Sequence, residues 1–297
     1  MQNNTQILCF GEILWDNLPS GAVAGGAPMN VALHLHQFGI EALVASSVGD
    51  DVSGEKLIDF LKDAGMDVRL VQKHSSLPTS QVLVKLDENN NATYEICEPV
   101  AWDDIKLEDE LAKEASKSKA IVFGSLSLRN PETKETLLKL LENKMIKIMD
   151  VNLRAPFIDE GTIRLLLSKS NIVKLNDDEL IIITDWFGYA GTQQERMQQL
   201  YEALKLDVLI TTRGSKGACL IAQGENCEHQ GFKVKTVDTV GSGDAFLAGF
   251  LAAMFEGKKM QRAITEACAI GAYVATQAGA TPKYSKDEIL NMNSLVN

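Results

Sequence analysis

The residues best suited to chemistry lie at positions 238–246, DTVGSGDAF, ahead of an apolar stretch with helical spacing. Gly241, Ser242 and Gly243 can turn their backbone N–H groups into an anion-binding nest at the positive end of that helix. A phosphate held there would raise the pKa of the Asp244 carboxyl and suit it to accept a proton. This pattern predicts phosphoryl transfer, with Asp244 as general base and the nest as anion hole. The alternative is a helix N-cap aspartate after a glycine turn.

A second candidate segment is GGAPMN at positions 25–30. Gly25 and Gly26 let the backbone approach a ligand closely, and Pro28 suits the first turn of a helix. Asn30 in that turn offers a donor and an acceptor, which suits the hydroxyl groups of a substrate. A tight strand-to-helix turn without a ligand is the alternative.

Composition and charge narrow the class of protein. Forty acidic and 29 basic side chains give a net charge of −11, which argues against nucleic acid or an anionic membrane bound by a broad basic face. The five cysteines form no CxxC pair, the start carries no secretory signal, and no apolar run is long enough to span a membrane. The four histidines show no metal-binding spacing. We therefore expect a cytoplasmic protein with reduced thiols and no nucleic-acid or membrane partner.

Strand-like and helix-like patterns alternate along the chain. A helix is predicted at 31–38 and another at 53–64 with Ser53 as its N-cap, and Asn130 is predicted to cap a third. Strands are predicted at 7–10, 42–48, 120–123, 147–151, 171–175 and 208–211. This alternation is typical of βαβ units and of a mainly parallel sheet covered on both faces, an α/β fold.

One stretch breaks the alternation of strands and helices, and its pattern is typical of a β-hairpin. Residues 80–86 and 92–96 alternate apolar and polar side chains on either side of a polar turn. With residues 13–24 they could form a small antiparallel sheet, either as an ordinary sheet edge or as a lid over a site. The apolar side chains of the hairpin, which could close on the lid of a second subunit, are Val82, Val84, Leu86, Tyr94 and Ile96.

The two glycine segments together resemble the signatures of the ribokinase-like (PfkB) family of carbohydrate kinases. GGAPMNVALHLHQFG resembles the N-terminal signature and DTVGSGDAFLAGF the C-terminal one, and the similarity runs from Phe10 to about Pro282. Within the family the chain is most similar to bacterial fructokinases, through FGEILWDNLP, AWDDI, FGSLSLR and DVNLR. The resemblance implies one kinase domain over residues 1–297. It also implies a Rossmann-type three-layer sandwich with a mainly parallel sheet, and a small β lid from segments at about 13–24 and 79–102.

The resemblance also assigns roles to individual residues. It implies ATP with Mg²⁺, a sugar acceptor, and Asp244 as base beside the anion hole of Gly241, Ser242 and Gly243. The residues that would bind the sugar are Asp16, Gly25, Gly26, Asn30, Asn152 and Arg154. The residues that would bind the nucleotide are Asn176, Glu179, Thr211, Arg213, Gly214 and Gly217, with Asn176 and Glu179 also organising Mg²⁺ through water. The backbone near Asp238 and Val240 would hold a monovalent cation, K⁺.

The expected reaction is transfer of the γ-phosphoryl group to a primary hydroxyl, giving fructose 6-phosphate from fructose. The chain departs from the fructokinase pattern where APFI follows DVNLR, which leaves open another acceptor such as 2-keto-3-deoxygluconate or a nucleoside. A non-catalytic ligand sensor is the alternative of another class. Trp102 would either stack on a sugar or anchor the hairpin. A homodimer formed through the lids is a further expectation of the resemblance.

Overall fold

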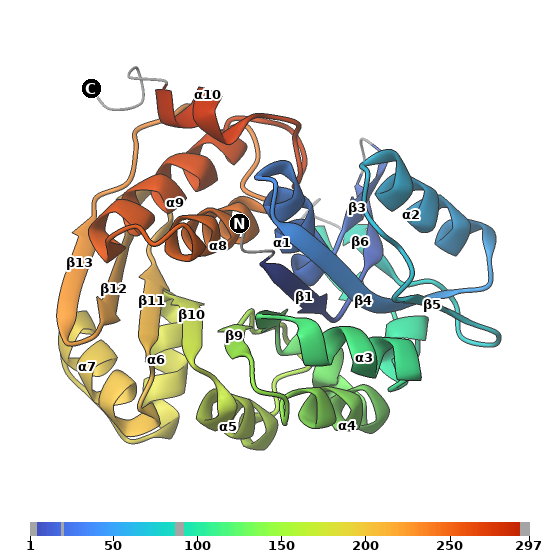
Figure 1. Cartoon of the computed structure of the whole chain (residues 1–297), viewed down its shortest axis with the longest axis horizontal. Helices are drawn as coiled ribbons and strands as arrows, with labels where there is room; N and C mark the ends of the chain where they lie inside the picture. Colours follow the sequence, from blue (N-terminus) through green and yellow to red (C-terminus); the bar gives the residue numbers. More distant parts are fainter. Residues whose placement is uncertain (1–4, 19–20, 87–91, 292–297) are drawn as a thin grey trace.

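A nine-stranded sheet forms the centre of the computed structural model, which describes residues 5–18, 21–86 and 92–291 (Figure 1). Its strand order is β13-β12-β11-β10-β9-β8-β1-β4-β5. All strands from β11 to β5 run parallel, whereas β12 and β13 join one edge as an antiparallel hairpin. The strands are β1 (Gln6–Phe10), β4 (Glu41–Gly49), β5 (Val71–His74), β8 (Ala120–Phe123), β9 (Ile146–Asp150), β10 (Ile172–Asn176), β11 (Val208–Thr212), β12 (Ala218–Ala222) and β13 (Glu225–His229).

Helices cover both faces of this sheet. Ile7 and Cys9 of β1 belong to the core on one face, whereas Leu8 and Phe10 belong to the core on the other, as strand alternation requires. The first face carries α1 (Ala27–Gln37), α2 (Val52–Asp63), α8 (Ser242–Phe255) and α9 (Met260–Val274). The second carries α3 (Asp109–Lys117), α4 (Pro131–Leu140), α5 (Glu160–Lys169), α6 (Asp177–Trp186) and α7 (Gln193–Leu204), and α10 (Lys286–Asn291) packs on α9. The predicted three-layer α/β fold is confirmed.

A second, four-stranded sheet has the order β3-β2-β6-β7. Its strands are β2 (Leu14–Leu18), β3 (Gly21–Gly25), β6 (Gln81–Leu86) and β7 (Ala92–Ile96). The predicted hairpin is present, with Val82 opposite Ile96. The sheet is mixed rather than antiparallel, because β2 pairs with β6 in parallel through Trp15 and Gln81. The predicted turn at 88–91 lies outside the described residues.

The start of α2 corrects one prediction. The N-cap is Asp51 and not Ser53, because the Asp51 carboxylate accepts a hydrogen bond from the backbone N–H of Gly54 at 2.7 Å. The same carboxylate also accepts the backbone N–H of Thr79 at 2.8 Å, so it fastens the helix to the segment before β6. Two strong acceptors in one place outcompete the serine hydroxyl two residues later.

Trp102 lies at the end of the segment that follows the hairpin, in the 3-10 helix η1 (Ala101–Asp104). Its ring is fully buried, with the guanidinium of Arg129 4.1 Å from the ring centre. Arg129 in turn pairs with Asp103 at 2.7 Å and has the ring of Phe157 on its other side. Of the two roles considered for Trp102, the structure supports the anchor, because a fully buried ring cannot stack on a sugar.

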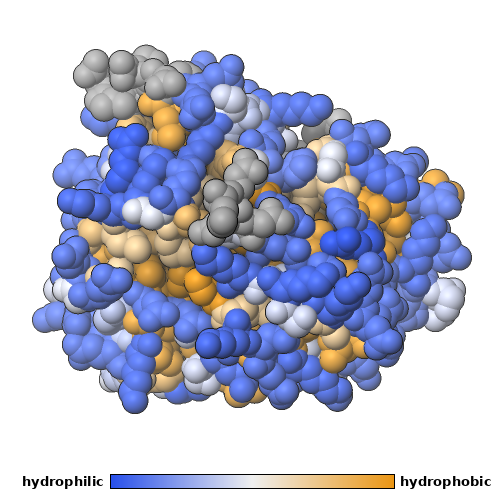
Figure 2. All heavy atoms as spheres, viewed as in Figure 1, coloured by the Kyte–Doolittle hydropathy of each residue, from blue (hydrophilic) through white to orange (hydrophobic). Residues whose placement is uncertain are grey.

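Hydrophilic side chains cover most of the face shown in Figure 2, and apolar ones are visible in separate patches between them. Across the residues placed by the structure, no helix is long and apolar enough to cross a membrane.

Candidate active site

A cavity of about 510 Å³ lies between the small sheet and the ends of the central strands. Open α/β sheets bind ligands at the carboxyl ends of their strands, and the segments after β1 and β9 contribute to this wall. The polar residues that line the cavity are Glu12, Asp16, Asn30, Asn152, Arg154, Asp238, Thr239 and Asp244. The other predicted site residues that line the cavity are Gly26, Val240, Gly241 and Gly243. The structure therefore brings most of the predicted sugar-binding and catalytic residues to one place.

Asp244 is buried in the first turn of α8, with 9% of its surface exposed. The side-chain Nδ2 of Asn30 on α1 donates a hydrogen bond to Asp244 Oδ2 at 2.8 Å. Burial raises the pKa of Asp244 to about 6 and nearby Asp150 adds to the rise, while Asn30, Lys174 and Arg154 oppose it. A carboxylate with this pKa is ionised at neutral pH and is still basic enough to share a proton with a hydroxyl.

Two glycines shape the backbone around Asp244 and Asn30. Gly241 is the N-cap of α8 at a φ of 74°, and a Cβ there would lie 2.6 Å from Ala280. Gly26 precedes α1 at a φ of 119°, and a Cβ there would lie 2.3 Å from the carbonyl oxygen of Glu12. Both positions exclude a side chain, so the N-termini of α1 and α8 come close to the same cavity. At the start of α8 the N–H of Ser242 already donates to the carbonyl oxygen of Thr239 at 3.2 Å, which leaves the N–H groups of Gly243 and Asp244 to face a ligand.

Three residues of the cavity have buried polar atoms with no hydrogen-bond partner in the described part of the chain. These atoms are Asn30 Oδ1, Asn152 Nδ2 and Glu12 Oε2. Asn152 also holds a left-handed backbone conformation, with a φ of 44°. Buried polar groups are normally paired, and strained backbone gathers at functional sites, so this cluster indicates a site that binds a polar ligand.

Glu12 is a site residue that the sequence reasoning missed. It is 4% exposed, and burial raises the pKa of its carboxyl to about 7, against the effects of backbone N–H groups and Arg154. Burial also raises the pKa of Asp16 on β2, and Arg154 lowers it. An acidic residue directly after a buried strand and a glycine was the available signal in FGE.

Asn176 and Glu179 form a capping box at the start of α6. Asn176 Oδ1 accepts the Glu179 N–H at 2.8 Å, and Glu179 Oε2 accepts the Asn176 N–H at 2.9 Å. Glu179 Oε1 also accepts the N–H of Leu153 at 2.8 Å. Burial raises the pKa of Glu179. Both carboxylate oxygens are thus occupied by backbone donors, and neither residue lines the 510 Å³ cavity.

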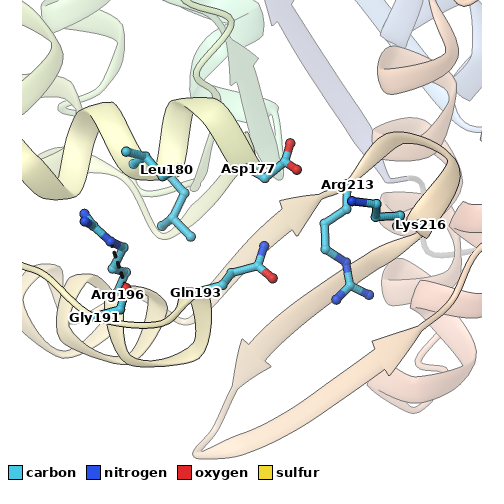
Figure 3. Close-up of a pocket in the computed structure, with 8 residues that line it drawn as sticks. Asp177, Leu180, Gly191, Gln193, Arg196, Arg213 and Lys216 are labelled. Atoms are coloured by element: carbon cyan, nitrogen blue, oxygen red, sulfur yellow. Dashed lines mark hydrogen bonds between the residues drawn. The ribbon is translucent and has the colours of Figure 1, made fainter.

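A second cavity, of about 490 Å³, lies between α6, α7 and the end of β11 (Figure 3). Arg213 and Lys216 border it with Asp177 of α6 and Gln193 of α7. The guanidinium of Arg213 is paired with Glu228 at 2.8 Å. Of the residues predicted to bind the nucleotide, only Arg213 lies in this cavity.

Three other residues predicted to bind the nucleotide lie outside both cavities. Thr211 is fully buried and its hydroxyl has no hydrogen-bond partner among the described residues, whereas the neighbouring Thr212 at the strand end is partly exposed. A Cβ on Gly217 would lie 2.0 Å from the carbonyl oxygen of His229, so this glycine is required by the backbone beside it. Gly214, at a φ of 55°, opens the 3-10 turn η3 (Gly214–Lys216) and faces open space.

The side chain of Asp238 joins two loops at the cavity. Its Oδ1 accepts the N–H of Val240 at 3.0 Å, and its Oδ2 accepts the N–H of Gly279 at 3.2 Å. No group of three or more His, Cys, Asp or Glu side chains among the described residues is arranged to hold a metal ion.

The small sheet faces the cavity with apolar side chains that were expected to be exposed. Val82 is 8% exposed, and both Val82 and its partner Ile96 line the cavity. They are therefore not part of an open surface for a second subunit. The side chains of Val84, Leu86 and Tyr94 lie outside the described ones.

The chain is similar to known proteins over most of its length. A fructokinase of Rhizobium leguminosarum bv. trifolii is 32% identical, over 88% of this chain and 82% of its own length. Two solved structures superpose over nearly the whole chain. A Xylella fastidiosa fructokinase with bound ATP has a TM-score of 0.84 at 23% identity and covers 98% of both chains. A Vibrio cholerae fructokinase bound to fructose, ADP and potassium has a TM-score of 0.83 at 21% identity and covers 99% of both. Residues 21–287 match the pfkB family carbohydrate kinase, and the chain therefore belongs to the pfkB family of carbohydrate kinases.

Proposed function

We propose that this kinase transfers the γ-phosphoryl group of ATP to a primary hydroxyl of fructose, giving fructose 6-phosphate. The observation that carries the proposal is Asp244, a buried carboxylate with a raised pKa at a helix N-terminus, held by Asn30 on a cavity of sugar size. The fructokinases among its relatives support fructose as the acceptor.

In the proposed mechanism the sugar lies against Asp16, Asn30, Asn152 and Arg154. Asn30 orients the Asp244 carboxylate, which accepts the proton of the attacking hydroxyl as the oxygen bonds to the γ-phosphorus and the bond to the bridging oxygen breaks, releasing ADP. The N–H groups of Gly243 and Asp244 at the start of α8 stabilise the charge on the transferring phosphoryl group. The small sheet acts as a lid that excludes water from the site. Water would otherwise accept the phosphoryl group and hydrolyse ATP.

ATP would extend from this anion hole toward Arg213 and Gly214. Asn176 and Glu179 fit a Mg²⁺ ion held through water rather than directly, because both Glu179 oxygens already accept backbone N–H groups. When bound, the metal would neutralise charge on the phosphates. The backbone near Asp238 and Val240 is the proposed K⁺ site, which a comparison of activity in potassium and sodium buffers would test.

A coupled assay of ADP release across a panel of sugars tests the proposal. Fructose is expected to give the highest kcat/KM. If none of the sugars in the panel gave ADP release, that result would contradict the proposal. Arg154 is a cation on the cavity wall, so the panel includes 2-keto-3-deoxygluconate, whose carboxylate it could bind. Higher kcat/KM for that acid would assign the acceptor to the alternative substrate.

Two further expectations remain proposals. The protein is proposed to be cytoplasmic, where ATP and sugars are available. A homodimer through the small sheets would have to use the face opposite Val82, where Leu83 is 38% exposed. A monomeric mass in solution would exclude that dimer.

A further inference from the structure

Lys174 and Asp150 form a buried ion pair that the mechanism above does not use. They are direct neighbours in the parallel register of β10 and β9. Lys174 Nζ lies 2.8 Å from both carboxylate oxygens of Asp150, and the two residues are only 5% and 3% exposed. Burial alone would lower the pKa of Lys174, but the carboxylates of Asp150, Asp244 and Glu179 together outweigh it and the pKa is raised. The lysine therefore carries a fixed positive charge inside the sheet.

This ammonium group lies directly under the start of α8. A Cβ on Gly243 would be 3.5 Å from Lys174 Nζ, so the ammonium faces Gly243 in the proposed anion hole with room for no more than a methyl group between them. An ammonium has three N–H donors, and among the described residues only Asp150 accepts from Lys174, through two contacts. The charge is thus placed next to the position where the transferring phosphoryl group would gain negative charge.

A structural role alone is a weak explanation for this pair. Taking two charges out of water is expensive, and apolar side chains of similar volume often stabilise a core equally well or better. The neighbouring positions of β10 are apolar, with Val173 and Leu175 in the core. The presence of a lysine and an aspartate in this strand pair therefore indicates that the positive charge of the lysine has a role other than stability.

We propose that Lys174 is a positioning residue for phosphoryl transfer: held by Asp150 against Gly243, its ammonium strengthens the anion hole at the N-terminus of α8. The inference rests on the proposed function. A positive charge in a dry site stabilises developing negative charge far more than it does in water. Asp150 keeps the ammonium in place. It also raises the pKa of Asp244 and so opposes the lowering that Lys174 causes.

The first test removes both charges together, in Asp150→Leu/Lys174→Met. This double variant leaves no unpaired buried charge, so it is expected to fold, which thermal unfolding checks. Fructose binding measured without nucleotide and the KM for fructose are expected to stay unchanged, while kcat falls by about 10- to 100-fold. A kcat equal to that of the wild type would overturn the inference.

The second test uses the single variants Lys174→Met and Asp150→Asn, which break the same contact. The charged and polar groups that face Asp244 are Glu12, Asp150, Lys174, Arg154 and Asn30. Loss of the lysine charge is expected to move the acidic limb of kcat/KM to higher pH, and loss of the Asp150 charge to lower pH. An acidic limb that stays at the wild-type pH in both variants would show that the two charges do not act on the site, and would also overturn the inference.

The control is Lys258→Met/Glu266→Gln, beyond the opposite end of α8 from Asp244, which removes the 2.8 Å pair of these two residues together with the contacts of Glu266 with Arg262 and Lys286. Its kcat is expected to match the wild type. The two hypotheses fail in different ways: a wild type that phosphorylates no sugar refutes the proposed function, whereas active charge variants beside an active wild type refute only the role of Lys174.

Discussion

Replacing Asp244 by Asn is expected to abolish turnover and, at the same time, to stabilise the fold. Burial raises the pKa of Asp244 from 3.8 to about 6. The unfolded chain therefore releases this proton at lower pH than the folded protein does, and wild-type stability falls as the pH rises between these values. The shift of roughly two units, at about 1.4 kcal/mol each, corresponds to a cost of about 3 kcal/mol above pH 6.

Asp244→Asn removes this cost because its side chain stays neutral and can still accept the hydrogen bond from Asn30. Urea unfolding is expected to give equal free energies for wild type and variant near pH ~4, and a more stable variant by about 3 kcal/mol near pH ~8. The kcat is expected to fall by about 100- to 10,000-fold, with ATP binding retained.

Asp51→Asn is the matched control, because its shift has the opposite sign. Burial alone would raise the pKa of Asp51, but hydrogen bonds from Thr79 and Gly54 outweigh it and lower the pKa. Its replacement should therefore destabilise the protein at neutral pH, and the difference should shrink as the pH falls. A stability difference for Asp244→Asn that is the same at both pH values would refute the reasoning, and so would near-normal turnover.

Three further variants test other parts of the structure. Asn30→Ala removes the hydrogen bond to the Asp244 carboxylate, and a hydrogen bond to a charged group contributes about 1.5–3 kcal/mol. The pKa of Asp244 should rise, so the acidic limb of kcat/KM should move up by roughly 1–2 pH units. A pH profile with an unmoved limb would contradict this. Gly26→Ala should cost more than about 1 kcal/mol in urea unfolding, because its Cβ meets a backbone oxygen. Gly39→Ala, also at positive φ but in open space, should cost less, and equal losses would count against the steric argument. Arg129→Met leaves Asp103 buried and unpaired and should cost about 3–5 kcal/mol in thermal unfolding, whereas Lys139→Met, in an exposed pair, should change little.

Features that are local in the chain could be predicted well from the sequence. Apolar runs and cap residues located the central strands and the Asn130 cap, which the structure confirms through a hydrogen bond to the Glu132 N–H. Alternation also located the hairpin, and it placed Val82 and Ile96, which pair in the structure, among the apolar side chains. The glycine segments indicated Asp244 and Asn30, because in each segment the glycines and the start of the next helix lie within a few residues of the polar side chain.

Features that depend on pairing between distant segments could not be predicted. Lys174 and Asp150 lie in separate strands, and only the register of β9 and β10 shows that they meet. Thr211 and Thr212 are equivalent in the sequence, but the alternation of β11 buries the first and leaves the second partly exposed. Three short strands at the two ends of the sheet, β5, β12 and β13, were missed, because their few residues carry a weak local pattern.

The hydrogen bond between Asn30 and Asp244 joins residues that are 214 positions apart. Closing so long a loop costs chain entropy, and contacts of this kind form late in folding or late in synthesis. Until α8 has left the ribosome, α1 lacks the helix against which it packs. A nascent or truncated chain can therefore hold the first strands of the sheet, yet it has no assembled site with which to split ATP. Recovery of activity during refolding should accordingly lag behind recovery of helical signal.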